Sequence, residues 1–298
     1  MITQNSITKE WIEAVAKSNK ADKNLVEKVI RALLLLEGLS ESKLNYVFKG
    51  GTALMLLFNS GKRLSIDIDI IVPKKETDLT EILKNICNTK SFTHFEKQER
   101  IAETNIEKEH YKLFFVSALN NQESHILLDV LKENIHYQNI IELPIDSTFI
   151  NHEDEPTTVR LSDFNNILGD KLTAFAPNTT GIPYRKGDKE MGMEIIKQMY
   201  DIGCLFDEAD NPEVVSLVFS SFAKTELEYR ENEGSMENVL DDIIETALSV
   251  CLRQSQGKSD FNILNKGIIQ VKPFFFQNNF TLKKQLLTQQ KRRILHQL

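Results

Sequence analysis

The sequence predicts an α+β protein, in which strands alternate with helices in the first half and the second half is mostly helical. In the first half, short β-branched runs end at turn residues, a pattern typical of strands. Beyond about residue 160, apolar residues recur at helical spacing over long segments. A polar stretch, HEDEP at 152–156, lies between the two patterns. We therefore expect two domains, spanning residues 1–155 and 156–298.

The expected elements of the first half follow from its apolar spacing and its turn residues. Leu25, Val29 and Leu33 recur at helical spacing, and Gly38 follows as a helix stop. Thr52 can cap the start of another helix. The predicted helices span 8–18, 22–38, 52–58 and 76–88, and the predicted strands span 46–48, 64–72, 111–118 and 124–131, with a hairpin turn at 120–122.

The second half is expected to form a helical bundle or cap. Its predicted helices span 162–175, 190–207, 212–230, 236–254 and 279–297. Between the first two, residues 176–187 contain two prolines and two glycines, which predicts a mobile loop. The acidic residues between 226 and 245 are expected to lie on a solvated helix surface.

Composition disfavours several classes of protein. The 298-residue chain has a net charge of −7, whereas a protein that coats duplex DNA is normally basic. Basic clusters at 62–63, 185–189 and 283–293 keep a local RNA site open. No apolar run reaches the ~18 residues of a membrane span, and the N-terminal sequence lacks a secretory signal pattern. Three widely spaced cysteines suit reduced thiols, so we expect a cytoplasmic protein without a membrane partner.

Two acids interrupt the β-branched run SIDIDII at 65–71. In a strand, Ile66, Ile68 and Ile70 share one face, and the other face carries Asp67, Asp69 and Ile71. Two residues of rise place these carboxylates about 7 Å apart, where ionised groups repel one another. A divalent cation removes that repulsion, because hard cations bind carboxylate oxygens. The alternative is an exposed strand with a polar outer face.

Gly50, Gly51 and Thr52 stand between a predicted strand and a predicted helix. Glycines let the backbone approach a ligand closely, and the free N–H groups at a helix N-terminus suit phosphate. A tight turn is the alternative. Together with Asp67 and Asp69, the stretch predicts a phosphate cradle one helix upstream of a metal-binding pair, which suits phosphoryl transfer from a nucleoside triphosphate. The stretch is not a Walker P-loop, because the GxxxxGK[ST] pattern is missing.

Asp129 interrupts the apolar strand HILLDVL at 125–131. An isolated buried aspartate is costly, so we expect it to have a partner. If this strand lies beside the strand of Asp67 and Asp69, Asp129 completes a set of three metal-binding carboxylates. A strand-end acid that faces water is the alternative.

These stretches resemble a known family. KGGTAL at 49–54, followed by RLSIDIDI at 63–70, resembles the nucleotidyltransferases of DNA polymerase β type, and more closely the AbiEii/AbiGii toxins, which include the MenT-like toxins. The resemblance extends to LGDKLTA at 168–174 and KQMYDI at 197–202, and so over most of the chain. It implies a nucleotidyltransferase core, with a mixed β-sheet flanked by helices, followed by a helical C-terminal region.

The resemblance implies a role for each matching residue of the first half. Gly50, Gly51 and Thr52 would hold the triphosphate, and Ser65 would assist them. The implied ligands of Mg²⁺ or Mn²⁺ are Asp67 and Asp69. Arg63 lies beside the acidic strand, where it either binds phosphates or forms part of an exposed turn.

In the second half, the resemblance implies that Lys171 contacts phosphate and that Asp201 supports the active site. Lys171 lies among apolar positions of a predicted helix, so it is either buried beside an anion or lies along the surface. Asp201 is either a surface acid or a hydrogen-bonded core acid. In this family an acid often stands at the position of Gln198, so Asp201 is either the functional acid or only its neighbour.

The leading hypothesis is a nucleotidyltransferase that transfers a nucleoside monophosphate from an NTP to an acceptor, with Mg²⁺ or Mn²⁺ as cofactor. The resemblance implies the toxin of a type IV-like toxin–antitoxin or abortive infection system. Its acceptor would be RNA, such as the tRNA 3′ end, and a cognate antitoxin would act with or without direct contact. A nucleotide-binding module without turnover is one alternative. Transfer to a protein or a small molecule is another, which the net charge mildly favours over RNA.

Overall fold

The chain divides into two compact units. The computed structural model describes residues 1–59, 62–73, 78–98, 108–230 and 233–275. Of these described residues, the first unit holds those within 1–135 and 139–163 together with 274 and 275, and the second holds 136–138 and those within 164–273. In the described ranges, no helix is both long enough and apolar enough to cross a membrane.

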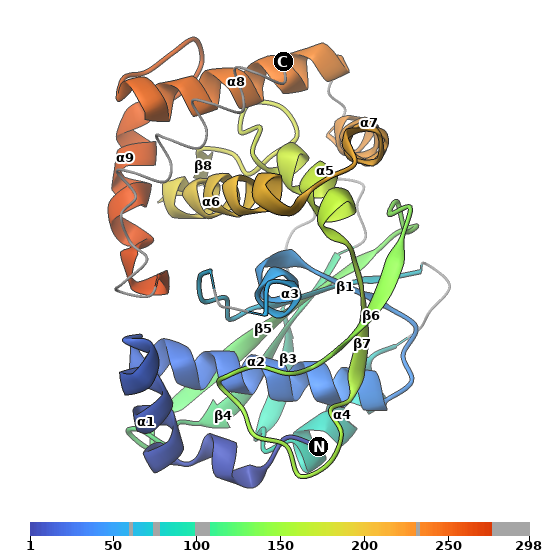
Figure 1. Ribbon diagram of the computed structural model, residues 1–298, viewed down its shortest axis with the longest axis vertical. Helices are drawn as coiled ribbons and strands as arrows, with labels where there is room; N and C mark the ends of the chain where they lie inside the picture. Colours follow the sequence, from blue (N-terminus) through green and yellow to red (C-terminus); the bar gives the residue numbers. More distant parts are fainter. Residues whose placement is uncertain (60–61, 74–77, 99–107, 231–232, 276–298) are drawn as a thin grey trace. The chain divides into compact units, whose positions relative to one another are not determined.

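The first unit is built on a mixed sheet. Its strands are β1 (Val47–Lys49), β2 (Ile68–Val72), β3 (His94–Gln98), β4 (Lys108–Val116), β5 (Glu123–Lys132), β6 (Ile140–Pro144) and β7 (Thr158–Ser162). The seven strands lie in the order β3-β4-β5-β2-β1-β7-β6 (Figure 1). Strand β1 pairs in parallel with β7, β2 pairs in parallel with β5, and the other neighbours are antiparallel. The predicted α+β fold with a mixed sheet flanked by helices is confirmed.

One face of this sheet is covered by helix and forms the core. The helical elements of the first unit are η1 (Gln4–Ile7), α1 (Lys9–Asn19), α2 (Lys23–Glu41), α3 (Gly50–Leu57) and α4 (Thr80–Thr89). Helix α2 runs across the sheet (Figure 1), and its Leu33 shares a hydrophobic cluster with Ile68, Ile70, Leu128 and Val130 of β2 and β5. The isoleucines at 68 and 70 therefore face the core, as predicted, and Asp69 points to the other face.

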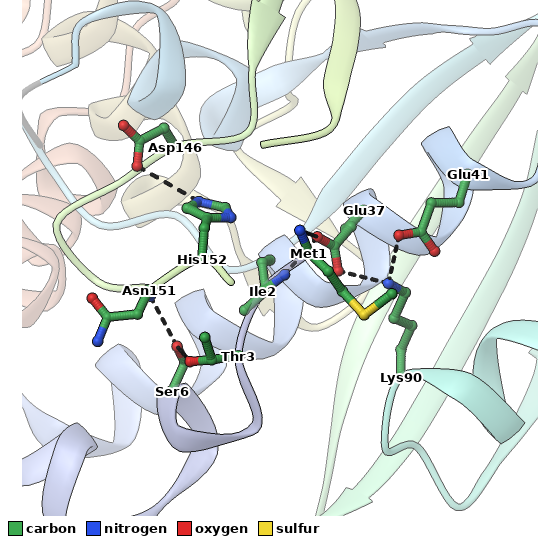
Figure 2. Close-up of polar contacts among 10 residues, drawn as sticks. All are labelled: Met1, Ile2, Thr3, Ser6, Glu37, Glu41, Lys90, Asp146, Asn151 and His152. Atoms are coloured by element: carbon green, nitrogen blue, oxygen red, sulfur yellow. Dashed lines mark hydrogen bonds and ion pairs between the residues drawn. The ribbon is translucent and has the colours of Figure 1, made fainter. Parts of the chain in front are cut away.

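A buried carboxylate fastens the N-terminal segment to α2 (Figure 2). The Glu37 side chain is 1% exposed, and its two oxygens accept hydrogen bonds from the Ile2 backbone N–H at 2.7 Å and from Lys90 Nζ at 2.6 Å. Lys90, at the end of α4, also donates to Glu41 at 2.8 Å. Because both oxygens of the carboxylate have partners, its burial is tolerated. The network joins three separate segments of the first unit.

The strand predicted at 64–72 is shorter than expected, because only β2 pairs in the sheet. The backbone ahead of β2 has other partners. The Leu64 N–H donates to the Phe274 carbonyl at 2.7 Å, and the Asp67 carbonyl accepts from the Thr52 hydroxyl at 2.6 Å. Asp67 therefore lies just ahead of the strand. The prediction that both acids lie on one strand is right for Asp69 and wrong for Asp67.

Strands β3, β6 and β7 are not among the predicted elements. Strand β3 is a polar edge strand, and β6 is the opposite edge strand and ends at Pro144. Strand β7 places Arg160 in solvent between buried Val159 and Leu161. It begins three residues beyond the domain boundary predicted at 155, yet it pairs with β1 in the sheet of the first unit.

The second unit is helical. Its helices are α5 (Phe164–Ala174), α6 (Gly192–Glu208), α7 (Pro212–Tyr229), α8 (Met236–Leu252) and α9 (Phe261–Gln270), and the turn η2 (Lys272–Phe274) follows. The first four match predicted helices, whereas α9 was not expected. The helix predicted at 279–297 lies outside the described residues. Helices α6 and α9 meet backbone to backbone, since a Cβ on Gly192 would lie 2.1 Å from the Ile263 carbonyl oxygen and one on Gly267 2.2 Å from the Gly192 carbonyl carbon.

The loop at 176–187, predicted to be mobile, is fastened to α8. The buried carboxylate of Asp242 accepts hydrogen bonds from the backbone N–H of Asn178 at 2.8 Å, from its side-chain amide at 2.7 Å, and from the Thr179 hydroxyl at 2.9 Å. The loop then ends in a small hairpin of β8 (Arg185–Lys186) and β9 (Lys189–Glu190). Proline and glycine marked the loop correctly, but they gave no sign of this anchor.

Candidate active site

A polar row crosses four strands of the first unit. In register, Lys49 of β1 lies beside Asp69 of β2, Asp69 beside Asp129 of β5, and Asp129 beside His110 of β4. Residues that oppose one another in a sheet point to the same face, so these four side chains share the face opposite the core. The strand of Asp129 therefore lies beside the strand of Asp69, which is the condition under which the sequence assigns Asp129 to a metal-binding set.

Asp129 has a hydrogen-bonded partner on the neighbouring strand. Nδ1 of His110 lies 2.6 Å from Oδ1 of Asp129. The His110 side chain is 14% exposed, and the Asp129 side chain is 39% exposed. Asp129 is thus neither an isolated buried acid nor a free strand-end acid. It is held by an imidazole and remains accessible.

The start of helix α3 lies against the Asp69 carboxylate. Gly50 has a φ of +80°, and a Cβ built on it would lie 2.0 Å from Oδ2 of Asp69. Only glycine adopts this backbone conformation readily and leaves room for the carboxylate. The first N–H groups of a helix have no partner inside the helix. The fold therefore places an acid and the N-terminus of a helix next to each other.

Arg63 and Ser65 flank the second glycine of the pair. A Cβ on Gly51 would lie 2.6 Å from the Ser65 hydroxyl oxygen and 2.7 Å from Nη2 of Arg63. The Arg63 residue is 6% exposed, and its Nη1 donates to the Leu64 carbonyl at 3.1 Å. Arg63 is therefore not part of an exposed turn. Its guanidinium is packed beside the beginning of α3.

Thr52 lies inside the first turn of α3 instead of capping the helix. Helix α3 begins at Gly50, and Lys49 occupies the cap position. The Thr52 hydroxyl, fully buried, donates to the Asp67 carbonyl at 2.6 Å. This bond ties the segment ahead of β2 to the helix, so Thr52 has a structural partner within the site.

The carboxylates fit a divalent cation in part. Across the described ranges, no three His, Cys, Asp or Glu side chains are gathered closely enough to bind a metal ion. Asp69 and Asp129 are nevertheless in-register neighbours on strands about 4.8 Å apart. Mg²⁺ is usually bound by one or two carboxylates together with substrate phosphates and water, so this pair suits it. Asp67 is not gathered with them into a set of three.

Lys171 and Asp201 form a buried ion pair within the second unit. Nζ of Lys171, on α5, lies 3.1 Å from Oδ2 of Asp201 and 2.8 Å from Oε1 of Gln198, both on α6. Lys171 is 6% exposed and Asp201 is 4% exposed. Both surface alternatives are thereby excluded, and the anion beside Lys171 is Asp201. Gln198, where the family often has an acid, contacts the same ammonium group.

Two members of the polar row, His110 and Lys49, are absent from the sequence-based prediction. Lys49 directly precedes Gly50, so its place beside the glycine pair was a usable signal. On β4, His110 and Lys112 alternate with Tyr111 and Leu113, which marks the two as part of one polar face. The alternation identifies the face. It does not reveal that Asp129 is the neighbour of His110, which depends on strand register.

A glycine-opened helix beside neighbouring carboxylates on a mixed sheet is the arrangement of a nucleotidyltransferase. The family model described as "Nucleotidyl transferase AbiEii toxin, Type IV TA system" matches residues 34–263, well over half of the chain. The chain belongs to this family, the AbiEii nucleotidyltransferase toxins of type IV toxin–antitoxin systems. Membership implies a nucleotide substrate and an antitoxin partner.

Solved structures show more distant likenesses. JHP933 from Helicobacter pylori is 16% identical with a TM-score of 0.42, over 85% of this chain and 97% of that chain. An antigenic nucleotidyltransferase-like protein from Paracoccidioides brasiliensis is 12% identical with a TM-score of 0.40, over 73% of this chain and 92% of that chain. A search of curated proteins found no match. The family assignment therefore rests on the match to the family model.

Proposed function

We propose that this toxin transfers a nucleoside monophosphate from an NTP to an RNA acceptor, such as the tRNA 3′ end, in a reaction that depends on Mg²⁺ or Mn²⁺. The carrying observation is the contact between the start of α3 and Asp69. A Cβ on Gly50 would overlap Oδ2 of Asp69 at 2.0 Å, and Asp129 lies next to Asp69 in register. The helix terminus to which we assign the phosphates and a carboxylate pair are thus adjacent.

Binding of the triphosphate is assigned to the beginning of α3. Backbone N–H groups of Gly50 and Gly51 have the character of a helix N-terminus, which favours phosphate through both hydrogen bonds and the helix dipole. The guanidinium of Arg63 and the hydroxyl of Ser65 lie beside Gly51 and add a cation and a donor. Thr52 supports this cradle by holding the backbone of Asp67.

The cation is assigned to the carboxylates of Asp69 and Asp129, and a contact from Asp67 stays a prediction. A bound Mg²⁺ or Mn²⁺ supplies positive charge that bridges phosphate and carboxylate oxygens. Asp69 and Asp129 carry this proposal because they are in-register neighbours. Asp67 lies directly ahead of β2, where its carbonyl accepts a hydrogen bond from Thr52, and its carboxylate is not gathered with the other two.

A phosphate contact by Lys171 remains a prediction, as does a supporting role for Asp201. Their ion pair gives the prediction a definite form, because a cation held by Asp201 and Gln198 is fixed in one orientation. A fixed cation costs less to organise around an anion than a mobile surface lysine does.

The decisive experiment supplies the purified protein with total RNA, Mg²⁺ and each of the four labelled NTPs in turn. Label is expected in RNA with at least one NTP. Asp69→Asn should lose most of this transfer, whereas Asp146→Asn, an exposed aspartate of the same unit, should retain it. The proposal is overturned if no NTP labels RNA and the wild-type protein is as harmless as Asp69→Asn when expressed.

A second candidate acceptor is a protein or a small molecule, which the net charge of −7 favours. Label found in protein, or in a small acceptor and not in RNA, supports this candidate. A nucleotide-binding module without turnover is distinguished by a melting temperature that rises with NTP and Mg²⁺ while no pyrophosphate is released.

A further inference from the structure

His110 stands out among the polar residues near the carboxylates. It lies on β4, whose core-facing residues Tyr111, Leu113 and Phe115 are buried. His110 points to the other face, where its in-register neighbour is Asp129. No role for it follows from the proposed reaction, although it makes one of the shortest polar contacts of the described residues, at 2.6 Å.

The direction of that hydrogen bond follows from its partners. An ionised aspartate can only accept hydrogen bonds, so Nδ1 of His110 carries the proton and donates it to Oδ1 of Asp129. This holds for the neutral ring and for the charged ring alike. One oxygen of Asp129 is thereby occupied, and the side chain loses its freedom to rotate away.

The need for such a donor follows from the neighbouring acid. Asp69 and Asp129 lie next to each other on paired strands, where two like charges destabilise the sheet and drive the side chains apart. A hydrogen-bond donor on β4, on the side of Asp129 opposite to Asp69, fixes the orientation of the Asp129 carboxylate. Residues that donate to metal-binding side chains orient them in the same way.

We propose that His110 is a positioning residue: its Nδ1–H holds Oδ1 of Asp129, so that the second oxygen is presented for a divalent cation shared with Asp69. The inference rests on the proposed function, which assigns the cation to these carboxylates. It adds a residue outside the acidic set and the glycine pair. It also makes the strand β4 part of the site.

Two substitutions separate the hydrogen bond from the bulk of the ring. His110→Asn places an amide donor near the position of Nδ1, whereas His110→Leu fills similar space without a donor. His94→Leu is the matched control, because His94 is an exposed histidine on β3 of the same sheet. Melting temperatures establish that each variant is folded. If His110→Leu fails to fold, His110→Gln replaces it, because the longer glutamine side chain places its amide away from the position of Nδ1.

The measurement is Mn²⁺ binding to the full chain, followed by the electron paramagnetic resonance signal of the free ion up to millimolar concentrations. The dissociation constant should rise about tenfold or more in His110→Leu, the usual effect of losing a group that orients a ligand. His110→Asn should stay within about threefold of wild type, as should His94→Leu. In turnover assays, His110→Leu should raise the half-saturating Mn²⁺ concentration more than it lowers kcat.

The outcomes distinguish the two proposals. If wild type binds Mn²⁺, Asp69→Asn does not, and His110→Leu binds as wild type does, His110 has no positioning role and the proposed function stands. If His110→Asn is as defective as His110→Leu, the donor is not the cause and the inference is overturned. If wild type and Asp69→Asn bind Mn²⁺ equally, the cation assignment itself fails, and the role of His110 fails with it.

Discussion

At the residue scale, Gly50 is the most constrained position of the site. Its positive φ of +80° is strained for any other residue, and a Cβ would also strike the Asp69 carboxylate. Gly187 provides a matched control, because its φ is +54° and a Cβ there meets nothing within 4 Å. Alanine at these two positions therefore separates backbone strain from a clash with the acid.

We predict that Gly187→Ala lowers the free energy of unfolding by about 1 kcal/mol, the cost of the left-handed conformation alone. Gly50→Ala should cost about 2 kcal/mol or more, because the clash adds to the strain. It should also abolish nucleotidyl transfer, since Asp69 must move. Urea denaturation and the labelling assay measure both effects. Equal losses of stability in the two variants would show that the Asp69 side chain moves aside without cost, and would contradict the added clash.

The buried pair of Lys171 and Asp201 makes a second prediction at this scale. Lys171→Met leaves the Asp201 carboxylate buried without its cation, which should cost about 3 kcal/mol of folding free energy. The double variant Lys171→Met/Asp201→Leu should recover part of that loss, because no unpaired charge remains. Chemical denaturation of the three proteins gives the comparison.

Lys224→Met is the control for this pair, because Lys224 and Glu228 form an exposed ion pair in the same unit. The control should change stability by less than about 1 kcal/mol. If Lys171→Met behaves like this control, the pair does not stabilise the second unit. A loss of transfer in a variant of unchanged stability would then favour a phosphate contact.

Some residues of the candidate site can be predicted from the sequence, and others cannot. The glycine pair and Asp69 are predictable, because each residue type has a direct chemical reason to stand where it does. Ser65 and Arg63 also lie beside Gly51, although their roles stay predictions. His110 is not predictable in the same way. Its importance depends on which residue of β5 stands opposite, and register is fixed by the whole sheet and not by local sequence.

At the element scale, the sequence predicts strands and helices best where burial is periodic. Helix α2 and strands β4 and β5 have long apolar patterns, and their predicted positions differ from the observed ones by a few residues. Strand β3 is a polar edge strand with a weak apolar signal, and β6 is a short edge strand that ends at Pro144. Helix α9 is short and contacts α6 through a glycine, which a search for apolar spacing does not count.

The anchor between the 176–187 loop and α8 gives a prediction of pH dependence. Burial raises the pKa of Asp242, against hydrogen bonds from Asn178 and Thr179 that favour the carboxylate. The folded protein thus binds this proton more tightly than the unfolded chain does. Asp242 contributes stability while it is protonated, below the ordinary aspartate pKa of about 3.9, and loses that contribution as the pH rises through its raised value.

Asp242→Asn removes this titration, so its melting temperature serves as the reference. The melting temperature of wild type minus that of Asp242→Asn is expected to fall as the pH rises from about 4 to about 7. Differential scanning fluorimetry across this range measures the difference, in which other titrating groups cancel. A difference that is constant, or that grows with pH, would contradict a raised pKa at Asp242.

At the scale of the whole molecule, net charge limits how RNA can bind. A chain with a charge of −7 cannot rely on a general attraction to nucleic acid, so an RNA acceptor must be held by local cations. Exposed Arg185, Lys186 and Lys189 on the β8–β9 hairpin form one such group. The basic cluster predicted at 283–293 lies outside the described residues.

Salt weakens the binding of RNA. Each contact between a cation and a phosphate of single-stranded RNA adds about −0.7 to the slope of log affinity against log salt concentration. If RNA is the acceptor, its KM should therefore rise steeply between about 50 and 200 mM KCl. The KM of an uncharged small acceptor should change little. An RNA acceptor whose KM is independent of salt would exclude the hairpin cations as its binding site.

The meeting of α6 and α9 at Gly192 and Gly267 has a consequence for genetics. Any side chain at either glycine must push two helices apart, so bacteria selected to survive expression of the toxin should carry escape mutations there. Such mutations would act by unfolding the toxin, whereas a change at Asp69 would test the proposed active site. Survival alone therefore cannot map the site. Escape variants need to be sorted by the amount of folded protein, and those that keep normal levels point to the residues that act.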